Sequence, residues 1–223
     1  MSALSSAAAR AVITLALLGA GFAAYTQVVA TGVVGPLDLE VARALAGVWR
    51  PPLGVLSQVV AVLGGVEVTS VLAAGLAVVL WRRGFRIEAA ALLAFPVAQL
   101  LEVVYKWSLR HPPPVSFEHP DGPSVVTMLH GGTLTLNGSY PSGHMMRTVL
   151  VYGLGAFVVR RLSSPGWVRT VAAPSAAAVI GLMALDRVYL GVHWQSDVVG
   201  GLLLGGAALA AAIAWLDRPR AVA

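Results

Sequence analysis

The sequence predicts an all-α protein, a six-span transmembrane helical bundle with a short external amphipathic helix and an external loop between spans three and four. Of its 223 residues, 57% are hydrophobic and 11% are charged, whereas a soluble domain carries about 25% charged residues. The mean hydropathy is +0.80. Six apolar runs approach or reach the roughly 20 residues that a helix needs to cross the hydrocarbon core.

The apolar runs follow one another along the chain and predict a single domain over residues 1–223. They lie at Ala11–Ala30, within Leu53–Trp81, and at Ile87–Trp107, Gly143–Val159, Val168–Leu185 and Val198–Trp215. The first run is longer than the apolar core of a signal peptide, so we interpret it as a retained span. Between the first two runs, Asp38–Trp49 has apolar residues at helical spacing and predicts the amphipathic helix, which Pro51 and Pro52 end.

Basic residues favour one side of the predicted bundle. Nine of the fifteen lie in connections that share a side with both termini: Arg10, Arg82, Arg83, Arg86, Arg160, Arg161, Arg169, Arg218 and Arg220. Cytoplasmic connections carry the excess of Lys and Arg, so we expect both termini to be cytoplasmic. The connection Arg110–Tyr140 is then external, and Val125–Leu136 within it is predicted to form a short hairpin. The arginines form no basic stripe, which argues against nucleic-acid binding despite a net charge of +5.

Three polar segments lie at the ends of predicted spans. They are Tyr105–Pro112, Tyr140–His144 and Asp186–Asp197. The predicted topology places all three on the external side of the membrane. Ionisable groups near membrane depth are costly and usually functional, so this convergence predicts a functional site.

The residue types in these segments suit the binding of a phosphate dianion and acid–base chemistry. The candidate phosphate ligands are cations and groups at a helix start: Lys106, Arg110, Ser142, Gly143, Arg147 and Arg187. His144 and His193 can divide the work of nucleophile and acid, and Asp197 can fix the imidazole tautomer of His193 if both lie on one helix. No cluster of carboxylates suggests a metal, so we expect neither a metal nor a cofactor.

These segments resemble the motifs of the type-2 phosphatidic acid phosphatase family, within the superfamily of membrane lipid phosphatases and haloperoxidases. Pro141-Ser142-Gly143-His144 matches the family's Pro-Ser-Gly-His motif, and Arg187, His193 and Asp197 match its last motif at the right spacing. The resemblance covers all six spans. It implies a single integral membrane phosphatase domain acting on a lipid phosphate or diphosphate, of the undecaprenyl diphosphate, phosphatidylglycerol phosphate or phosphatidic acid type.

The resemblance also implies a role for each matching residue. His193 would attack phosphorus and form a phosphohistidine, Asp197 would orient it, and His144 would protonate the leaving group. The phosphoryl oxygens would be held by Lys106, Ser142, the Gly143 amide and Arg187. The implied location is a bacterial cell membrane, with the site on the external face and membrane lipids as neighbours.

Two positions depart from the family pattern. Asp186 stands where the family has a serine before the arginine, which places a negative charge near the phosphate. The first motif continues from lysine through six residues to arginine-proline, and counting from Lys106 the arginine position holds Pro113. Arg110 and Arg147 are the two candidates to replace that cation, and Arg147 is favoured because an arginine within an apolar span needs a partner.

Other functions stay open on the sequence alone. A phosphotransferase would use the same site with another acceptor, and a haloperoxidase shares the oxyanion site, although those enzymes are soluble. A transporter or non-catalytic membrane protein would hold its ionisable residues nearer the midplane. We expect His111, His119 and His130 to be surface loop residues, and Glu102 to pair with Lys106 one turn later.

Overall fold

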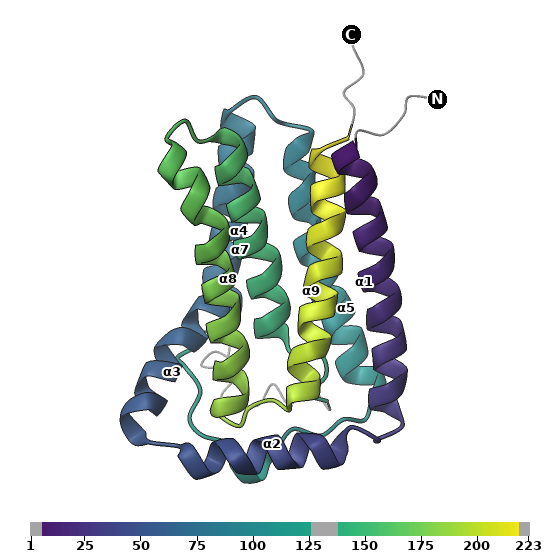
Figure 1. The fold of residues 1–223 in the computed structure, drawn as a ribbon, viewed down its shortest axis with the longest axis vertical. Coiled ribbons are helices and arrows are strands. Elements are labelled where there is room, and N and C mark those ends of the chain that lie inside the picture. The colour runs from purple at the N-terminus through teal and green to yellow at the C-terminus, as the bar shows by residue number, and fades with distance from the viewer. Residues whose placement is uncertain (1–5, 126–137, 219–223) are drawn as a thin grey trace.

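The computed structural model describes residues 6–125 and 138–218, which are largely helical and contain no strand. The helices stand side by side, and α2 lies across the end of the bundle opposite the two termini (Figure 1). They are α1 Ser6–Ala30, α2 Gly35–Val48, α3 Pro51–Gly64, α4 Val66–Arg82, α5 Ala94–Ser108, α7 Gly143–Leu162, α8 Gly166–Tyr189 and α9 Gln195–Leu216. The predicted all-α class is confirmed over the described residues.

Within residues 6–125 and 138–218, five helical stretches are long and apolar enough to cross a membrane. They are Ala9–Ala30, Pro51–Arg82, Glu88–Ser108, Gly166–Tyr189 and Gln195–Leu216. The predicted fourth span corresponds to α7, which has 20 residues but carries Arg147 near its start and Arg160 and Arg161 in its last turn. These charges make α7 less apolar than the other stretches, so the count of six spans stays a prediction.

The second predicted span is two helices in the structure. α3 ends at Gly64, α4 starts at Val66, and Gly65 caps both. A Cβ on Gly64 would lie 2.7 Å from Met183 Cε and 2.8 Å from Thr148 Oγ1. The helix break therefore falls where the chain packs directly on α7 and α8, and a side chain at Gly64 would hold them apart.

α9 packs against both α1 and α7. Its contact with α7 depends on small residues, because a Cβ on Gly201 would lie 2.4 Å from Ser142 O and one on Gly205 would lie 2.6 Å from Met146 O. Glycines allow two helix backbones to approach closely. This approach brings the first turn of α9 against the first turn of α7.

α2 starts at Gly35, slightly before the predicted start at Asp38, and one of its polar residues faces the protein. Asp38 is 2% exposed and accepts hydrogen bonds from Ser196 N at 2.9 Å and Ser196 Oγ at 2.7 Å. Burial raises the pKa of the Asp38 carboxyl. The helical pattern correctly indicated an amphipathic helix, but it did not indicate that Asp38 joins α2 to the start of α9.

The connection after α5 is described from Leu109 to Val125, and the predicted hairpin beyond it lies outside the described residues. Hydrogen bonds join the described part to the connection between α8 and α9. Trp194 Nε1 donates to Pro112 O at 2.7 Å, and His119 N donates to Leu190 O at 2.8 Å. This segment therefore follows the rim of the region where the polar segments meet.

Candidate active site

The three polar segments predicted from the sequence meet at the end of the bundle that α2 crosses (Figure 1). Backbone hydrogen bonds join them directly. Ser139 N donates to His111 O at 2.8 Å, and Ser142 N donates to Asp197 O at 2.9 Å. The end of α5, the start of α7 and the α8–α9 connection thus form one site.

His193 and Asp197 form the central pair of the site. His193 Nδ1 lies 3.1 Å from Asp197 Oδ2, which also accepts a hydrogen bond from Trp194 N at 3.0 Å. His193 precedes α9, whereas Asp197 lies in its first turn, so the contact comes from the capping geometry and not from a shared helical face. Burial lowers the pKa of the His193 imidazole, and Asp197 opposes that shift.

His111 reaches the other oxygen of the same carboxylate. Its Nε2 lies 3.4 Å from Asp197 Oδ1 and 3.2 Å from Ser196 Oγ. The His111 side chain is 13% exposed, so the expectation that His111 is a surface loop residue was wrong. No helical or motif spacing links His111 to Asp197, and only the fold brings them together.

Lys106, Glu102 and Arg147 form a chain of charges from the site into the bundle. Lys106 Nζ lies 2.8 Å from Glu102 Oε1, which confirms the predicted pair. Arg147 Nη1 lies 3.2 Å from Glu102 Oε2 and 3.2 Å from Gln99 Oε1, and its Nε donates to Gly64 O at 3.0 Å. Arg147 is buried, and these contacts hold its guanidinium against protein acceptors.

The start of α7 carries the Pro-Ser-Gly-His motif. Ser142 is the N-cap, and its hydroxyl accepts a hydrogen bond from Met145 N, which satisfies one of the free amides of the first turn. Gly143 packs on Glu102, since a Cβ there would lie 2.0 Å from Glu102 Oε1. His144 follows in the first turn of α7, within electrostatic range of Arg187, Lys106 and His193.

Arg187 lies at the end of α8 with a fully buried side chain. It donates to both oxygens of Asp121, from Nη1 at 2.9 Å and Nη2 at 3.0 Å, and from Nε to Asp186 Oδ2 at 2.9 Å. This paired geometry is the one that arginine also uses for a phosphate. Asp121 is a site residue that sequence reasoning missed, because it lies in an irregular segment 66 positions away.

Arg110 differs from the other candidate cations. It follows the end of α5 and is exposed, and its side chain forms no hydrogen bond or ion pair within residues 6–125 and 138–218. The described residues also contain no group of three or more His, Cys, Asp or Glu side chains that would hold a metal ion. The polar groups of the site are thus cations, histidines and carboxylates that pair with them.

The fold and the site together define a class of helical membrane proteins that place motif histidines beside cations at one end of the bundle. A sequence profile of the PAP2 superfamily matches residues 87–221, and the chain belongs to this superfamily. The crystal structure of a transmembrane PAP2-type phosphatidylglycerolphosphate phosphatase from Bacillus subtilis matches with a TM-score of 0.71. That match covers 88% of this chain and 92% of the other at 25% identity.

Curated relatives also match parts of the chain. Glucose-6-phosphatase 3 of Mus musculus is 32% identical over 56% of this chain and 37% of its own length. The undecaprenyl-diphosphatase of Sulfolobus acidocaldarius is 33% identical over 56% of this chain and 53% of its own length. Phosphatidylglycerophosphatase B of Bacillus subtilis is 34% identical over 37% of this chain and 39% of its own length. The matched segments thus span between about a third and about a half of these relatives.

Proposed function

We propose that the protein is a six-span membrane phosphatase that hydrolyses a lipid phosphate or lipid diphosphate through a phosphohistidine. The single observation that carries this proposal is the pairing of His193 with Asp197 beside the capped start of α7 and Lys106. The names of the bacterial and archaeal relatives support a lipid diphosphate or phosphatidylglycerol phosphate as substrate.

The pairing selects the nucleophilic atom. Asp197 Oδ2 accepts the Nδ1 proton of His193, so the free electron pair of the neutral ring is at Nε2. Nε2 forms a bond to phosphorus while the bond from phosphorus to the leaving oxygen breaks. His144 gives a proton to that oxygen, which leaves as a lipid alcohol or lipid phosphate.

The second half of the reaction regenerates the enzyme. His144, now neutral, takes a proton from a water molecule that attacks the phosphohistidine. The bond from phosphorus to Nε2 breaks, and inorganic phosphate leaves. Asp197 stabilises the positive charge on the His193 ring in the intermediate, as in other oriented histidine sites.

The phosphoryl oxygens lie between the start of α7 and the neighbouring cations. Ser142, the Gly143 amide, Lys106 and Arg187 are the assigned ligands. Arg110 is the exposed cation available to replace the arginine missing at Pro113, and Arg147 contributes by holding Glu102 and thereby Lys106. The negative charge of a phosphoryl group is spread over its oxygens, so several charge-assisted hydrogen bonds stabilise it best.

The proposed orientation follows from the distribution of basic residues. The termini lie at the end with most arginines and are cytoplasmic, and the site faces the opposite, external side of a bacterial cell membrane. α2 then lies along the outer surface. Its exposed apolar residues, Leu37 at 53% and Val48 at 55%, suit the interface between headgroups and chains.

Phosphate release from a panel of lipid phosphates and diphosphates tests the function. Wild type should release phosphate with a chelator present, and His193→Ala should release none. His119→Ala is the matched control, because His119 stacks on Trp49 at 4.2 Å on the same rim. Equal activity in wild type and His193→Ala would refute the mechanism. Transfer of the phosphate to another lipid without release would assign a phosphotransferase.

A further inference from the structure

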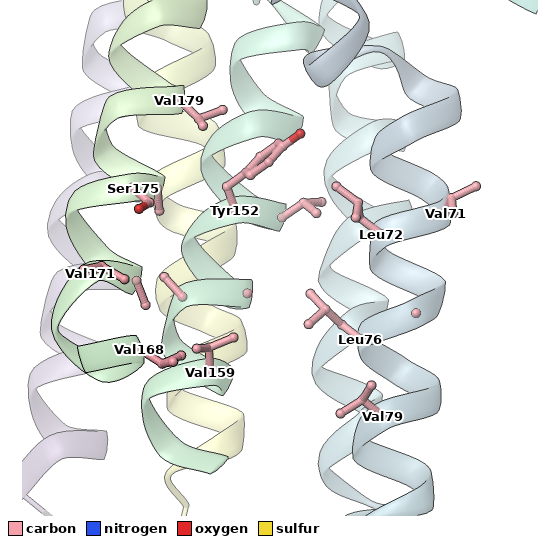
Figure 2. A pocket seen from close by; sticks show the side chains of 16 residues that line it. Val71, Leu72, Leu76, Val79, Tyr152, Val159, Val168, Val171, Ser175 and Val179 are labelled. Carbon is pink, nitrogen blue, oxygen red and sulfur yellow. The ribbon is translucent and has the colours of Figure 1, made fainter. Parts of the chain in front are cut away.

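Two of the open grooves between the described helices have volumes of about 770 and 650 Å³. The larger lies between α4, α7 and α8 and is lined by side chains such as Leu72, Leu76 and Val171 (Figure 2). Its lining is apolar except for the hydroxyls of Tyr152 and Ser175, and the Tyr152 hydroxyl donates to Leu63 O. This groove offers a lipid chain a surface but offers a charged headgroup no partner.

The second groove differs in its chemistry. It has a volume of about 650 Å³ and is lined by residues of α7, α8 and α9. α8 and α9 each pack along α7 but touch each other little, so the small residues of α7 form the floor. That floor includes Gly153 and Ala156, and the α8 wall includes Ala173 and Ala177. The result is a narrow apolar channel along the bundle.

Arginines line the end of this groove nearest the chain termini. Arg160 and Arg161 come from the last turn of α7, and Arg169 comes from the first turn of α8. Arg161 Nη1 pairs with Asp217 Oδ1. Arg160 and Arg169 form no ion pair within the part of the chain that the structure describes. Three cations and one carboxylate give this rim a net positive charge.

We propose that this groove binds one anionic phospholipid, with its phosphate at Arg160 and Arg169 and an acyl chain along the α7 floor. An arginine guanidinium matches phosphate oxygens in paired geometry. Basic pockets between transmembrane helices on the cytoplasmic side suit acidic headgroups. The groove has both parts of the required chemistry in one cavity, a positive rim and an apolar channel.

The bound lipid is a ligand and not the substrate. The arginines of the groove lie at the end of α7 and the start of α8, on the side of the termini. The start of α9, which carries Asp197 and follows His193, lies at the opposite end of the bundle (Figure 1). A helix spans about 1.5 Å per residue, so the 16 residues from His144 to Arg160 correspond to roughly 24 Å. The inference therefore stands whether or not the proposed phosphatase activity is correct.

Native mass spectrometry of the full chain in detergent micelles tests this site. Phosphatidylglycerol and phosphatidylcholine with identical acyl chains are added separately. Wild type should retain phosphatidylglycerol at about tenfold lower concentration than phosphatidylcholine. The double variant Arg160→Gln/Arg169→Gln should lose that preference. The control Arg82→Gln/Arg83→Gln removes the same charge at the same end, away from the groove, and should keep it.

A second variant separates the apolar channel from the charged rim. Ala177→Trp fills the groove while leaving every arginine in place, so phosphatidylglycerol retention should fall severalfold. Equal retention of both lipids by wild type would overturn the proposal, as would an equal loss in the Arg82/Arg83 control. A dimer that Ala177→Trp abolishes, with no lipid retained by wild type, would assign the groove to a second copy of the chain instead.

Discussion

His111 Nε2 and Asp197 Oδ1 lie 3.4 Å apart, on the opposite side of the carboxylate from His193. Asp197 Oδ1 is buried and has no hydrogen-bond partner among the described residues. With Asp38 ionised, the Ser196 hydroxyl gives its one proton to Asp38 Oδ2 and can only accept from His111 Nε2. The proton therefore sits on Nε2, which donates to Ser196 Oγ and lies 3.4 Å from Asp197 Oδ1.

Removing that proton donor should lower turnover. His111→Leu removes the N–H that donates to Ser196 Oγ and lies beside Asp197 Oδ1, so Asp197 should orient His193 less well and kcat should fall by about tenfold. KM should change little, because His111 is not one of the assigned phosphate ligands. His111→Gln, which retains an N–H donor, should recover most of the loss. A change in KM alone, or equal loss in both variants, would contradict this role.

Asp121 occupies the N–H donors of Arg187 that the proposed phosphoryl group would use. The two are bonded through both carboxylate oxygens, and the Asp121 side chain is 38% exposed while Arg187 is fully buried. At the proposed site, a bound phosphoryl group would therefore compete with Asp121 for the same N–H donors. Asp121→Asn removes the competing charge and should lower the inhibition constant of vanadate severalfold.

The control for Asp121→Asn is Glu118→Gln, which removes an exposed acidic charge from the same segment. It should leave vanadate inhibition unchanged. Weaker vanadate inhibition in Asp121→Asn would show instead that Asp121 fixes Arg187 for substrate, since losing the pair would then disorder the cation.

Gly143 has no space for a side chain. A Cβ there would lie 2.0 Å from Glu102 Oε1, so Gly143→Ala should displace Glu102, which holds Lys106. We expect at least a hundredfold loss of kcat/KM and a lower Tm. Gly155→Ala is the matched control on the same helix, because its Cβ would meet only Leu76 Cδ1 at 3.9 Å. That variant should be as active as wild type and equally or more stable. Normal activity in Gly143→Ala would contradict the packing argument.

The pH dependence of kcat/KM should report on His193. Burial lowers the pKa of this imidazole; Asp197 raises it, and Lys106 and Arg187 lower it further. The reactive form is the neutral ring, which exists above the pKa, so the acid limb should lie below the ordinary histidine value of about 6.5. Asp197→Asn should move that limb further toward acid and reduce kcat on the order of a thousandfold. An acid limb above pH 6.5 would contradict the burial argument.

The helical class could be predicted from the sequence because apolar runs of membrane length leave few alternatives. The contact between His193 and Asp197 could also be predicted, because their spacing is local. Asp38, His111 and Asp121 could not be assigned. Each of these residues contributes one polar group from a segment that is distant in the sequence. The sequence pattern alone does not distinguish such a residue from a polar residue on the surface. The sequence also did not identify Glu102 as the partner of Arg147, because the two side chains face each other only after α5 and α7 have packed.

Arg147 and Arg110 should respond to substitution in different ways. Arg147 is 7% exposed and is bonded to Glu102, Gln99 and Gly64. Arg147→Ala leaves a buried carboxylate with one partner fewer, a change that costs about 3–5 kcal/mol in buried ion pairs, so the Tm should fall strongly and activity should fall with it. Arg110→Ala should keep the wild-type Tm and raise KM severalfold, because an exposed cation near the proposed phosphate site is lost.

The double variant Arg147→Met/Glu102→Leu replaces both buried charges by apolar groups. It should regain stability but stay poorly active, because Lys106 has lost its partner. A wild-type Tm in Arg147→Ala, combined with a hundredfold loss in kcat/KM, would assign Arg147 to the phosphate directly.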